Sequence, residues 1–342
     1  MLESSRFWCG TACVLATGLL ASPRVAERNG AVLRITRTPQ IAFASHRDGN
    51  WEIYLTDSDG QNQTRLTRSD PQDRFPLWSP DRSRIAFGSQ VGGDHWELWV
   101  VNVDGTNPRF LATDIVAKGH RQWSHDGTRI VFSARVDDNV DVFVVDVATG
   151  QLTRLTNSPG DDADPAWSPD DRHIAFSSMR DGNPEIYVMR ADGTDPRRLT
   201  NDAAPDRSPD WSPDGTRIAF ISRAGAGDAY LVRLDDGRLE RLTVDAHATN
   251  DGARWSASGA YIAVQTSAGS YDIQIIRMSD RERRTIGATA SYDGQFSWSS
   301  SGDQLAFISE RDGFNALYVT DVTGNQRRLT SSLSLNPEWS PP

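Results

Sequence analysis

The sequence has little of several features that mark familiar functional classes. Only two cysteines, Cys9 and Cys13, occur among 342 residues, which excludes a disulfide framework and a four-thiolate zinc site. No run of 18 apolar residues occurs, so no segment is predicted to span a membrane as a helix. Lys and Arg number 36 against 46 Asp and Glu, and this net charge of −10 argues against binding to nucleic acid or anionic lipid. The Gly-x-Ser-x-Gly elbow of many hydrolases is also missing.

The N-terminal residues form a separate segment. Residues 7–21 are a mostly apolar stretch that follows Arg6 and precedes Pro23. That length and order are typical of a secretory signal peptide. The sequence therefore predicts a signal peptide over residues 1–26, with a buried N-terminal helix as the alternative, and a linker or extra strand over residues 27–40. Cleavage would leave a periplasmic or secreted chain without cysteine, able to fold in an oxidising compartment.

Tryptophan marks an internal repeat. A Trp-Ser pair recurs at spacings of 41 to 45 residues, and its tryptophans are Trp78, Trp123, Trp167, Trp211, Trp255, Trp298 and Trp339. A triplet of the type Ile174-Ala175-Phe176 follows each of the first six after seven residues, and Ile41-Ala42-Phe43 supplies a seventh copy. Two more β-rich runs complete each unit. Four short β segments at this period, joined by Asp-Gly turns, predict an all-β fold, a seven-bladed β-propeller of four-stranded antiparallel blades.

The repeat begins and ends at different points of its pattern. The first segment, Ile41-Ala42-Phe43, corresponds to a second strand, whereas the last, around Trp339, corresponds to a first strand. We therefore expect the C-terminal strand to complete the first blade and to close the ring, which leaves no open sheet edge. The predicted propeller spans residues 41–342.

Each unit also has a fixed order of motifs. In one unit these are Asp164-Pro165-Ala166-Trp167-Ser168-Pro169-Asp170, Ile174-Ala175-Phe176, Arg180-Asp181-Gly182, Ile186-Tyr187-Val188 and Arg198-Leu199-Thr200. This order resembles the TolB-like (PD40, WD40-like) propeller repeat, over residues 41–340. The resemblance implies a protein of the bacterial envelope, since TolB is a periplasmic component of the Tol-Pal system. TolB itself has an N-terminal α/β domain and six blades, whereas this sequence predicts seven blades and no such domain.

The position five residues before each repeated tryptophan is rich in acidic side chains. Since this position precedes the innermost strand, we expect its side chains to gather at one mouth of the channel. The residues predicted for this mouth are Asp73, Lys118, His120, Asp162, Asp164, Asp206, Asn250 and Asp293. Hard cations prefer clustered carboxylates, so Asp162, Asp206 and Asp293 are candidate ligands for Ca²⁺. The alternatives are a binding surface for a partner, or carboxylates that cap local turns.

Two classes of function fit this organisation. The first hypothesis is a non-enzymatic exported scaffold, expected to be a monomer, that binds a protein or peptide partner of the cell envelope on the channel-mouth face. The second is a metal-dependent carbohydrate lyase or hydrolase with its site in the channel, because the repeats also resemble those of oligogalacturonate lyases. That resemblance implies a histidine-rich metal site, whereas the six histidines occupy different positions of the repeat. The Trp-Ser pairs themselves are expected to pack between blades.

Overall fold

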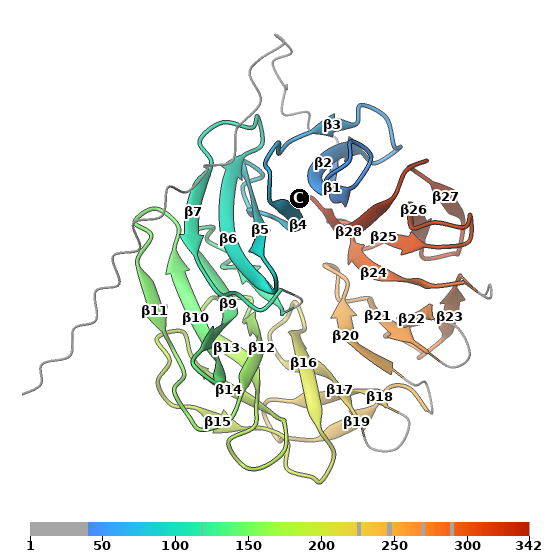
Figure 1. The fold of residues 1–342 in the computed structure, drawn as a ribbon. Coiled ribbons are helices and arrows are strands. Elements are labelled where there is room, and N and C mark those ends of the chain that lie inside the picture. The colour runs from blue at the N-terminus through green and yellow to red at the C-terminus, as the bar shows by residue number, and fades with distance from the viewer. Residues whose placement is uncertain are drawn as a thin grey trace, which may run out of the picture.

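Seven four-stranded antiparallel sheets surround a central channel in the computed structural model of the protein (Figure 1). The structure describes residues 40–341, with gaps at 118, 224–226, 245–247, 268–270 and 288–290. The predicted signal peptide and residues 27–39 lie outside this range. Within it, no helix is long and apolar enough to span a membrane. The seven-bladed propeller predicted from the sequence is confirmed.

Each blade runs from an innermost strand at the channel to an outermost strand at the rim. Blade 1 consists of β28 (Ser334–Trp339), β1 (Gln40–Ser45), β2 (Glu52–Asp57) and β3 (Thr64–Arg65), and blade 2 of β4 (Gln72–Trp78), β5 (Arg84–Gly92), β6 (His95–Asn102) and β7 (Arg109–Ala112). Blade 3 consists of β8 (Arg121–Trp123), β9 (Arg129–Val136), β10 (Asn139–Asp146) and β11 (Leu152–Arg154), and blade 4 of β12 (Asp162–Trp167), β13 (His173–Ser178), β14 (Glu185–Arg190) and β15 (Arg197–Arg198). Blade 5 consists of β16 (Asp206–Trp211), β17 (Arg217–Ser222), β18 (Asp228–Arg233) and β19 (Leu239–Arg241), and blade 6 of β20 (Ala248–Trp255), β21 (Tyr261–Thr266), β22 (Asp272–Arg277) and β23 (Arg283–Ile286). Blade 7 consists of β24 (Asp293–Trp298), β25 (Gln304–Ser309), β26 (Ala316–Asp321) and β27 (Gln326–Arg328).

The ring closes as the sequence predicts. The C-terminal strand β28 pairs antiparallel with β1, and Trp339 lies opposite Ile41. The backbone N–H of Ser340 also donates to the carbonyl of Gln40 at 2.8 Å. Blade 1 therefore combines both ends of the propeller, and β28 covers the edge of β1 that would otherwise be unpaired.

The second strand of each blade forms the centre of the core. Its aliphatic-small-apolar triplet is at most 1% exposed in every blade. These strands contain continuous apolar runs because both of their faces are covered by neighbouring blades. The buried clusters accordingly join adjacent sheets; for example, Leu98 of blade 2 packs with Trp123 and Phe132 of blade 3.

Most innermost strands contain a bulge just before the tryptophan. In β4, Arg74 lies opposite Gly88 and Leu77 opposite Ala86, so one extra residue is inserted on the inner strand. The residue three positions before the tryptophan takes a positive φ in six blades, as with Phe75 (57°) and Asp164 (53°). A bulge bends its strand and changes the direction of the side chains that follow. It therefore decides which residues face the channel.

Candidate functional site

The repeated tryptophans lie at the seams between blades, and all but the partly exposed Trp298 are at most 9% exposed. Four of them donate an indole N–H bond of 3.1–3.2 Å to the carbonyl of the residue that precedes the tryptophan of the previous blade: Trp78 to Glu338, Trp123 to Leu77, Trp211 to Ala166 and Trp298 to Arg254. The other three tryptophans donate their backbone N–H, at 2.7–3.1 Å. The acceptor is the side chain of the residue directly before the tryptophan of the previous blade: Trp167 bonds Gln122, Trp255 bonds Asp210 and Trp339 bonds Ser297. The two kinds of seam alternate around the ring from Trp123 to Trp78.

The residue directly before each tryptophan lines the channel. Going around the ring from blade 2, these residues are Leu77, Gln122, Ala166, Asp210, Arg254, Ser297 and Glu338. They differ in size, polarity and charge, whereas the tryptophans beside them are constant. The side chains that line the channel therefore vary from blade to blade, while the tryptophans that support them are the same in every blade.

A cavity of about 260 Å³ lies in the channel. It contains His120 and Arg121 of blade 3, Asp210 of blade 5, Arg254 of blade 6 and Glu338 of blade 1. His120 and Arg254 come from opposite sides of the ring, and the Arg254 guanidinium donates a hydrogen bond to the His120 ring. This contact crosses the channel from blade 3 to blade 6.

The ionisable groups of the cavity have perturbed pKa values, chiefly because they are buried. Burial lowers the pKa of His120 well below its usual value, and the positive charges of Arg254 and Arg121 lower it further. Burial raises the pKa of Glu338 to about 7, although the Ser297 hydroxyl and Arg254 act against this shift. Burial also raises the pKa of Asp210. A neutral His120 can accept the hydrogen bond of Arg254.

A larger hollow of about 610 Å³ occupies the mouth at which the first strands end. We call it the funnel. Its wall is made by the seven repeated tryptophans and by turn residues such as Pro80, Pro169 and Pro213. Asp210 and Glu338 line both the funnel and the smaller cavity, so they lie where the two meet.

The carboxylates predicted for the opposite mouth are placed inside the blades. Asp73, Asp162, Asp206 and Asp293 each begin or nearly begin an innermost strand and are at most 1% exposed. Asp73 accepts hydrogen bonds from Ser69 and Ser89, at 2.8 and 2.7 Å. Burial raises the pKa of Asp73 to about 7 and that of Asp206 to about 7. These side chains hold strands together and do not form an acidic mouth.

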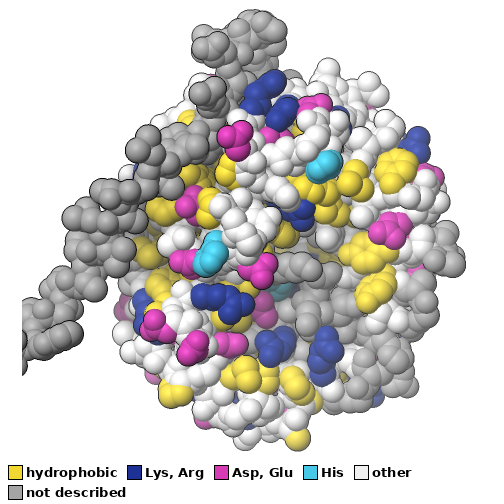
Figure 2. All heavy atoms as spheres, viewed as in Figure 1, with side chains coloured by type: hydrophobic (Ala, Val, Ile, Leu, Met, Phe, Trp, Pro, Cys, Tyr) yellow, Lys and Arg dark blue, Asp and Glu magenta, His cyan; other side chains and the backbone are white. Residues whose placement is uncertain are grey.

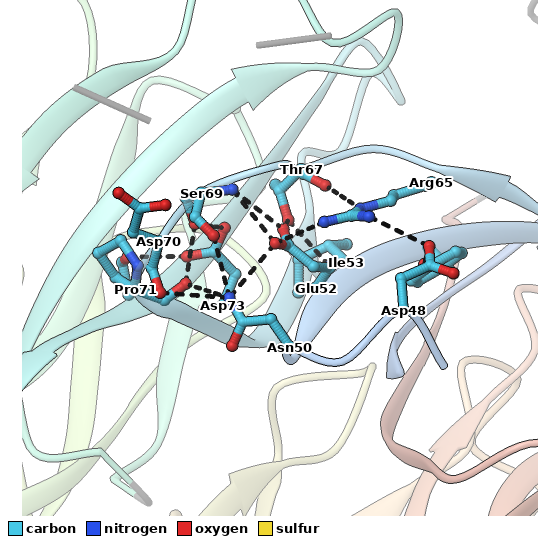
Figure 3. A network of polar contacts seen from close by, with 12 residues as sticks. Asp48, Asn50, Glu52, Ile53, Arg65, Thr67, Ser69, Asp70, Pro71 and Asp73 are labelled. Atoms are coloured by element: carbon cyan, nitrogen blue, oxygen red, sulfur yellow. Dashed lines mark hydrogen bonds and ion pairs between the residues drawn. The ribbon is translucent and has the colours of Figure 1, made fainter. Parts of the chain in front are cut away.

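These acidic side chains belong to a buried network, shown for blade 1 in Figure 3. Glu52 at the start of β2 forms an ion pair of 2.8 Å with Arg65. It also accepts a hydrogen bond of 2.7 Å from Thr67, whose hydroxyl in turn accepts the N–H of Ile53. Ser69 donates its N–H to Glu52 and its hydroxyl to Asp73. The network thus ties the outer strand of one blade to the inner strand of the next.

The same acid–Arg–Thr network recurs in other blades. Its three members are Asp141, Arg154 and Thr156 in blade 3, Glu185, Arg198 and Thr200 in blade 4, and Asp228, Arg241 and Thr243 in blade 5. The acidic member is fully buried in each case. These networks explain the Arg-Leu-Thr motif of the repeat as a structural element.

The remaining predicted mouth residues have mixed placements. His120 lines the channel cavity, and Asp164, in the bulge of β12, has a pKa raised by burial and lowered in part by Arg207 and Arg254. Lys118 and the side chain of Asn250 lie outside the described residues. Asp162, Asp206 and Asp293 lie in three different blades, and within the described part of the chain no three His, Cys, Asp or Glu side chains are placed to hold one metal ion.

The surface drawn in Figure 2 carries charges of both signs. Basic and acidic side chains are interspersed around the central hollow, without a single acidic field. Three aromatic residues lie at or beside the connections between second and third strands: Trp51 and Trp96 are buried, at 8% and 6% exposed, and Tyr271 is 46% exposed. Trp51 packs edge-on against His46, and Trp96 against Phe75.

Sequence reasoning missed the main features of the site. The sequence does contain a signal for the channel-lining position: the residue directly before each tryptophan varies, whereas the motif around it is constant. A strict two-residue alternation places the residues five and one before the tryptophan on the same side of a strand. The bulge between them breaks that alternation.

Comparisons with known proteins agree with the fold. Residues 94–270 match the TolB beta propeller domain, PD40. A TolB homolog of Chlorobaculum tepidum is 41% identical over 54 residues, which cover 16% of this chain and only 12% of that relative. TolB from Acinetobacter baumannii has a similar structure, with a TM-score of 0.61 and 18% identity over 89% of this chain and 67% of the other. An oligogalacturonate lyase from Vibrio parahaemolyticus gives a TM-score of 0.67 and 18% identity over 83% and 87% of the two chains. At this identity the two structures show a shared fold alone.

Proposed function

The chain belongs to the TolB β-propeller domain family, and on that premise we propose that it is an exported, non-enzymatic scaffold that binds a protein or peptide partner at a mouth of its channel. The funnel carries this proposal. Its volume of about 610 Å³ lies in the range of ligand-binding clefts. Turns from all seven blades contribute to its wall, so a ligand there would contact the whole ring.

The compartment is part of the proposal. The predicted signal peptide over residues 1–26 would carry the chain to the periplasm or out of the cell. The names of the curated relatives, which include a Tol-Pal system protein, support an envelope role. We propose that the mature protein acts there as a monomer.

The alternative, a metal-dependent carbohydrate lyase or hydrolase, has weaker support. A lyase of similar fold is described in complex with manganese, but that likeness concerns fold. A metal-dependent mechanism needs several converging ligands. In the described part of the chain, His120 and His125 line the channel or its funnel without a third ligand beside them.

Site-specific crosslinking tests the scaffold proposal. A photo-crosslinking amino acid at Ala257, which lines the funnel, should capture one protein in the native envelope. The same amino acid at Leu152, 48% exposed on the outer strand β11, is the control and should capture none. The partner, identified and purified, should then bind the isolated propeller. Equal capture at both positions, or no capture at Ala257, would contradict the proposal.

A further inference from the structure

The funnel differs from the rest of the molecule in its charged residues. The chain contains 36 Lys and Arg, yet none of the residues that line the funnel is a lysine or an arginine. The acidic side chains that line it are Asp210 and Glu338, which come from blades 5 and 1. The rest of the wall consists of tryptophan, proline and small or uncharged residues, together with His125.

Nearby arginines are engaged elsewhere. Arg84, Arg129 and Arg217 lie over the rings of Trp123, Trp167 and Trp255, at 4.7–5.1 Å from the ring centroids. Arg254 lines the smaller cavity, where it contacts His120. Basic groups are therefore present near the funnel, but none of these four arginines is among the residues that line it.

The two funnel carboxylates have no basic partner in contact. One oxygen of Asp210 accepts the backbone N–H of Trp255 at 2.8 Å. Among the described residues no ion pair within 4.0 Å is formed by Asp210 or Glu338, and the nearest basic group that acts on both of them is Arg254 of the adjoining cavity. Burial raises the pKa of both carboxylates, and the positive charge of Arg254 lowers it only in part. A cation placed between them would relieve the electrostatic cost.

The wall of the funnel suits the uncharged part of such a ligand. Leu77 lies near its base, and Pro80, Pro169, Pro213 and Pro341 stand around it. A lysine or arginine side chain buries its methylene stem against apolar surface and keeps its charged end at a polar group. The volume of the funnel leaves room for neighbouring residues of a peptide.

We propose that the funnel binds a positively charged side chain of a peptide segment, with Asp210 and Glu338 holding the charge and the prolines packing against its stem. This inference rests on the proposed scaffold function and adds the chemistry and the place of recognition. It distinguishes the funnel mouth from the opposite mouth, where the sequence had suggested the acidic site.

A pair of probes tests the charge requirement. The blocked pentapeptide Gly-Gly-Arg-Gly-Gly is titrated into the full propeller by calorimetry, against the same peptide with citrulline, which has nearly the same shape without the charge. We expect the arginine peptide to bind about tenfold more tightly, and its binding to weaken as salt is added. Equal affinities of the two peptides would overturn the inference.

Variants locate the binding. Glu338→Gln and Asp210→Asn should each lower the affinity for the arginine peptide by about tenfold, and neither should alter binding of the citrulline peptide. Glu310→Gln removes one exposed carboxylate from the β25–β26 turn at the other end of the blade and should leave the affinity unchanged. Unchanged affinity in a folded Glu338→Gln variant would overturn the inference even if Asp210→Asn fails to fold, because Asp210 also bonds Trp255.

The outcome can be separated from that of the scaffold proposal. If crosslinking at Ala257 captures a partner whose affinity for Glu338→Gln matches that for the unmodified propeller, the scaffold proposal stands and the charge inference falls. If the arginine peptide binds as expected but no partner is captured, the charge inference stands and the scaffold proposal falls.

Discussion

Blade 4 and blade 2 are built from the same repeat, but they connect differently to the next blade. In blade 4, Glu185 pairs with Arg198 at 2.6 Å and accepts the Thr200 hydroxyl at 2.7 Å. Blade 2 has Glu97 at the corresponding position, and Phe110 and Ala112 replace the arginine and the threonine. Glu97 accepts the indole N–H of Trp99 instead, at 2.8 Å.

The next innermost strand shows the consequence. After blade 4, the chain enters β16 at Asp206 in register with Ser222. After blade 2, it forms a single bridge between Ile115 and Ala134 and begins β8 only at Arg121. His120 therefore enters the channel and contacts Arg254. We infer that the acid–Arg–Thr network fixes the connection between blades, and that its loss in blade 2 frees residues to fill the channel.

The largest expected effect is a difference in stability loss between equivalent substitutions in blade 4 and blade 2. Glu185→Gln should lower the free energy of unfolding by about 2 kcal/mol, because it breaks a buried ion pair whose arginine is still partly hydrated. Glu97→Gln should cost less than about 0.5 kcal/mol, since glutamine can still accept the Trp99 indole bond. Urea unfolding of both variants measures the difference. Equal costs would show that the network does not distinguish the blades.

A smaller effect is expected from the threonine of the network. Thr200→Val should cost about 1.5 kcal/mol, because it removes a hydrogen bond to Glu185 and leaves the buried N–H of Ile186 without its acceptor. Thr113→Val, at an exposed position beside Ala112 of blade 2, is the matched control and should lie within about 0.5 kcal/mol of the unmodified protein. Thermal unfolding provides the measurement, and a similar loss in both variants would contradict the role of the hydroxyl.

The smallest expected effect is a change of stability with pH, which should differ between blade 5 and blade 4. Asp162 of blade 4 forms an ion pair of 3.2 Å with Arg180, whereas Asp206 in blade 5 has only the hydroxyls of Ser222 and Thr200 to lower its pKa against burial. Burial raises the pKa of Asp206 to about 7. Its contribution to stability is thus fully present below the pKa of the unfolded state, about 3.9, and is lost as the pH rises through 7.

Asp206→Asn removes this pH-dependent loss. At pH 8 the variant should be more stable than the unmodified protein by about 1 kcal/mol, and at pH 5 the gain should disappear. Asp162→Asn breaks the pair with Arg180 and should destabilise the protein at pH 8. Melting temperatures at both pH values test the pair. A gain for Asp206→Asn that is the same at pH 5 and pH 8 would contradict the assigned titration.

The fold could be predicted from the sequence because its determinants are repeated. The Trp-Ser pair, the Ile-Ala-Phe triplet and the hairpin turns recur seven times, so an error at one copy does not change the count. Closure followed from the position of Trp339 in the pattern. These features depend on burial and turn geometry, which are local properties of the chain.

The site could be predicted only in part, because it depends on departures from the repeat. The sequence predicts that the residue five positions before each tryptophan faces the channel, but the bulges place Asp73 and Asp206 inside the blades and turn the residue directly before the tryptophan toward the channel. His120 was singled out from its neighbours, and it does line the channel. Its contact with Arg254, 134 residues later, joins two irregular positions that no local pattern connects.

The alternation of the seams has a consequence for the size of the ring. Indole bonds and side-chain bonds alternate from one blade to the next, and a cycle with an odd number of members cannot alternate throughout. The two consecutive seams of the same kind are those of Trp78 and Trp123, on either side of blade 2. That blade follows the sheet in which the two ends of the propeller meet. In a ring of six or eight such repeats the two kinds of seam could alternate throughout. The pair of identical seams beside blade 2 is therefore a consequence of the odd number of blades.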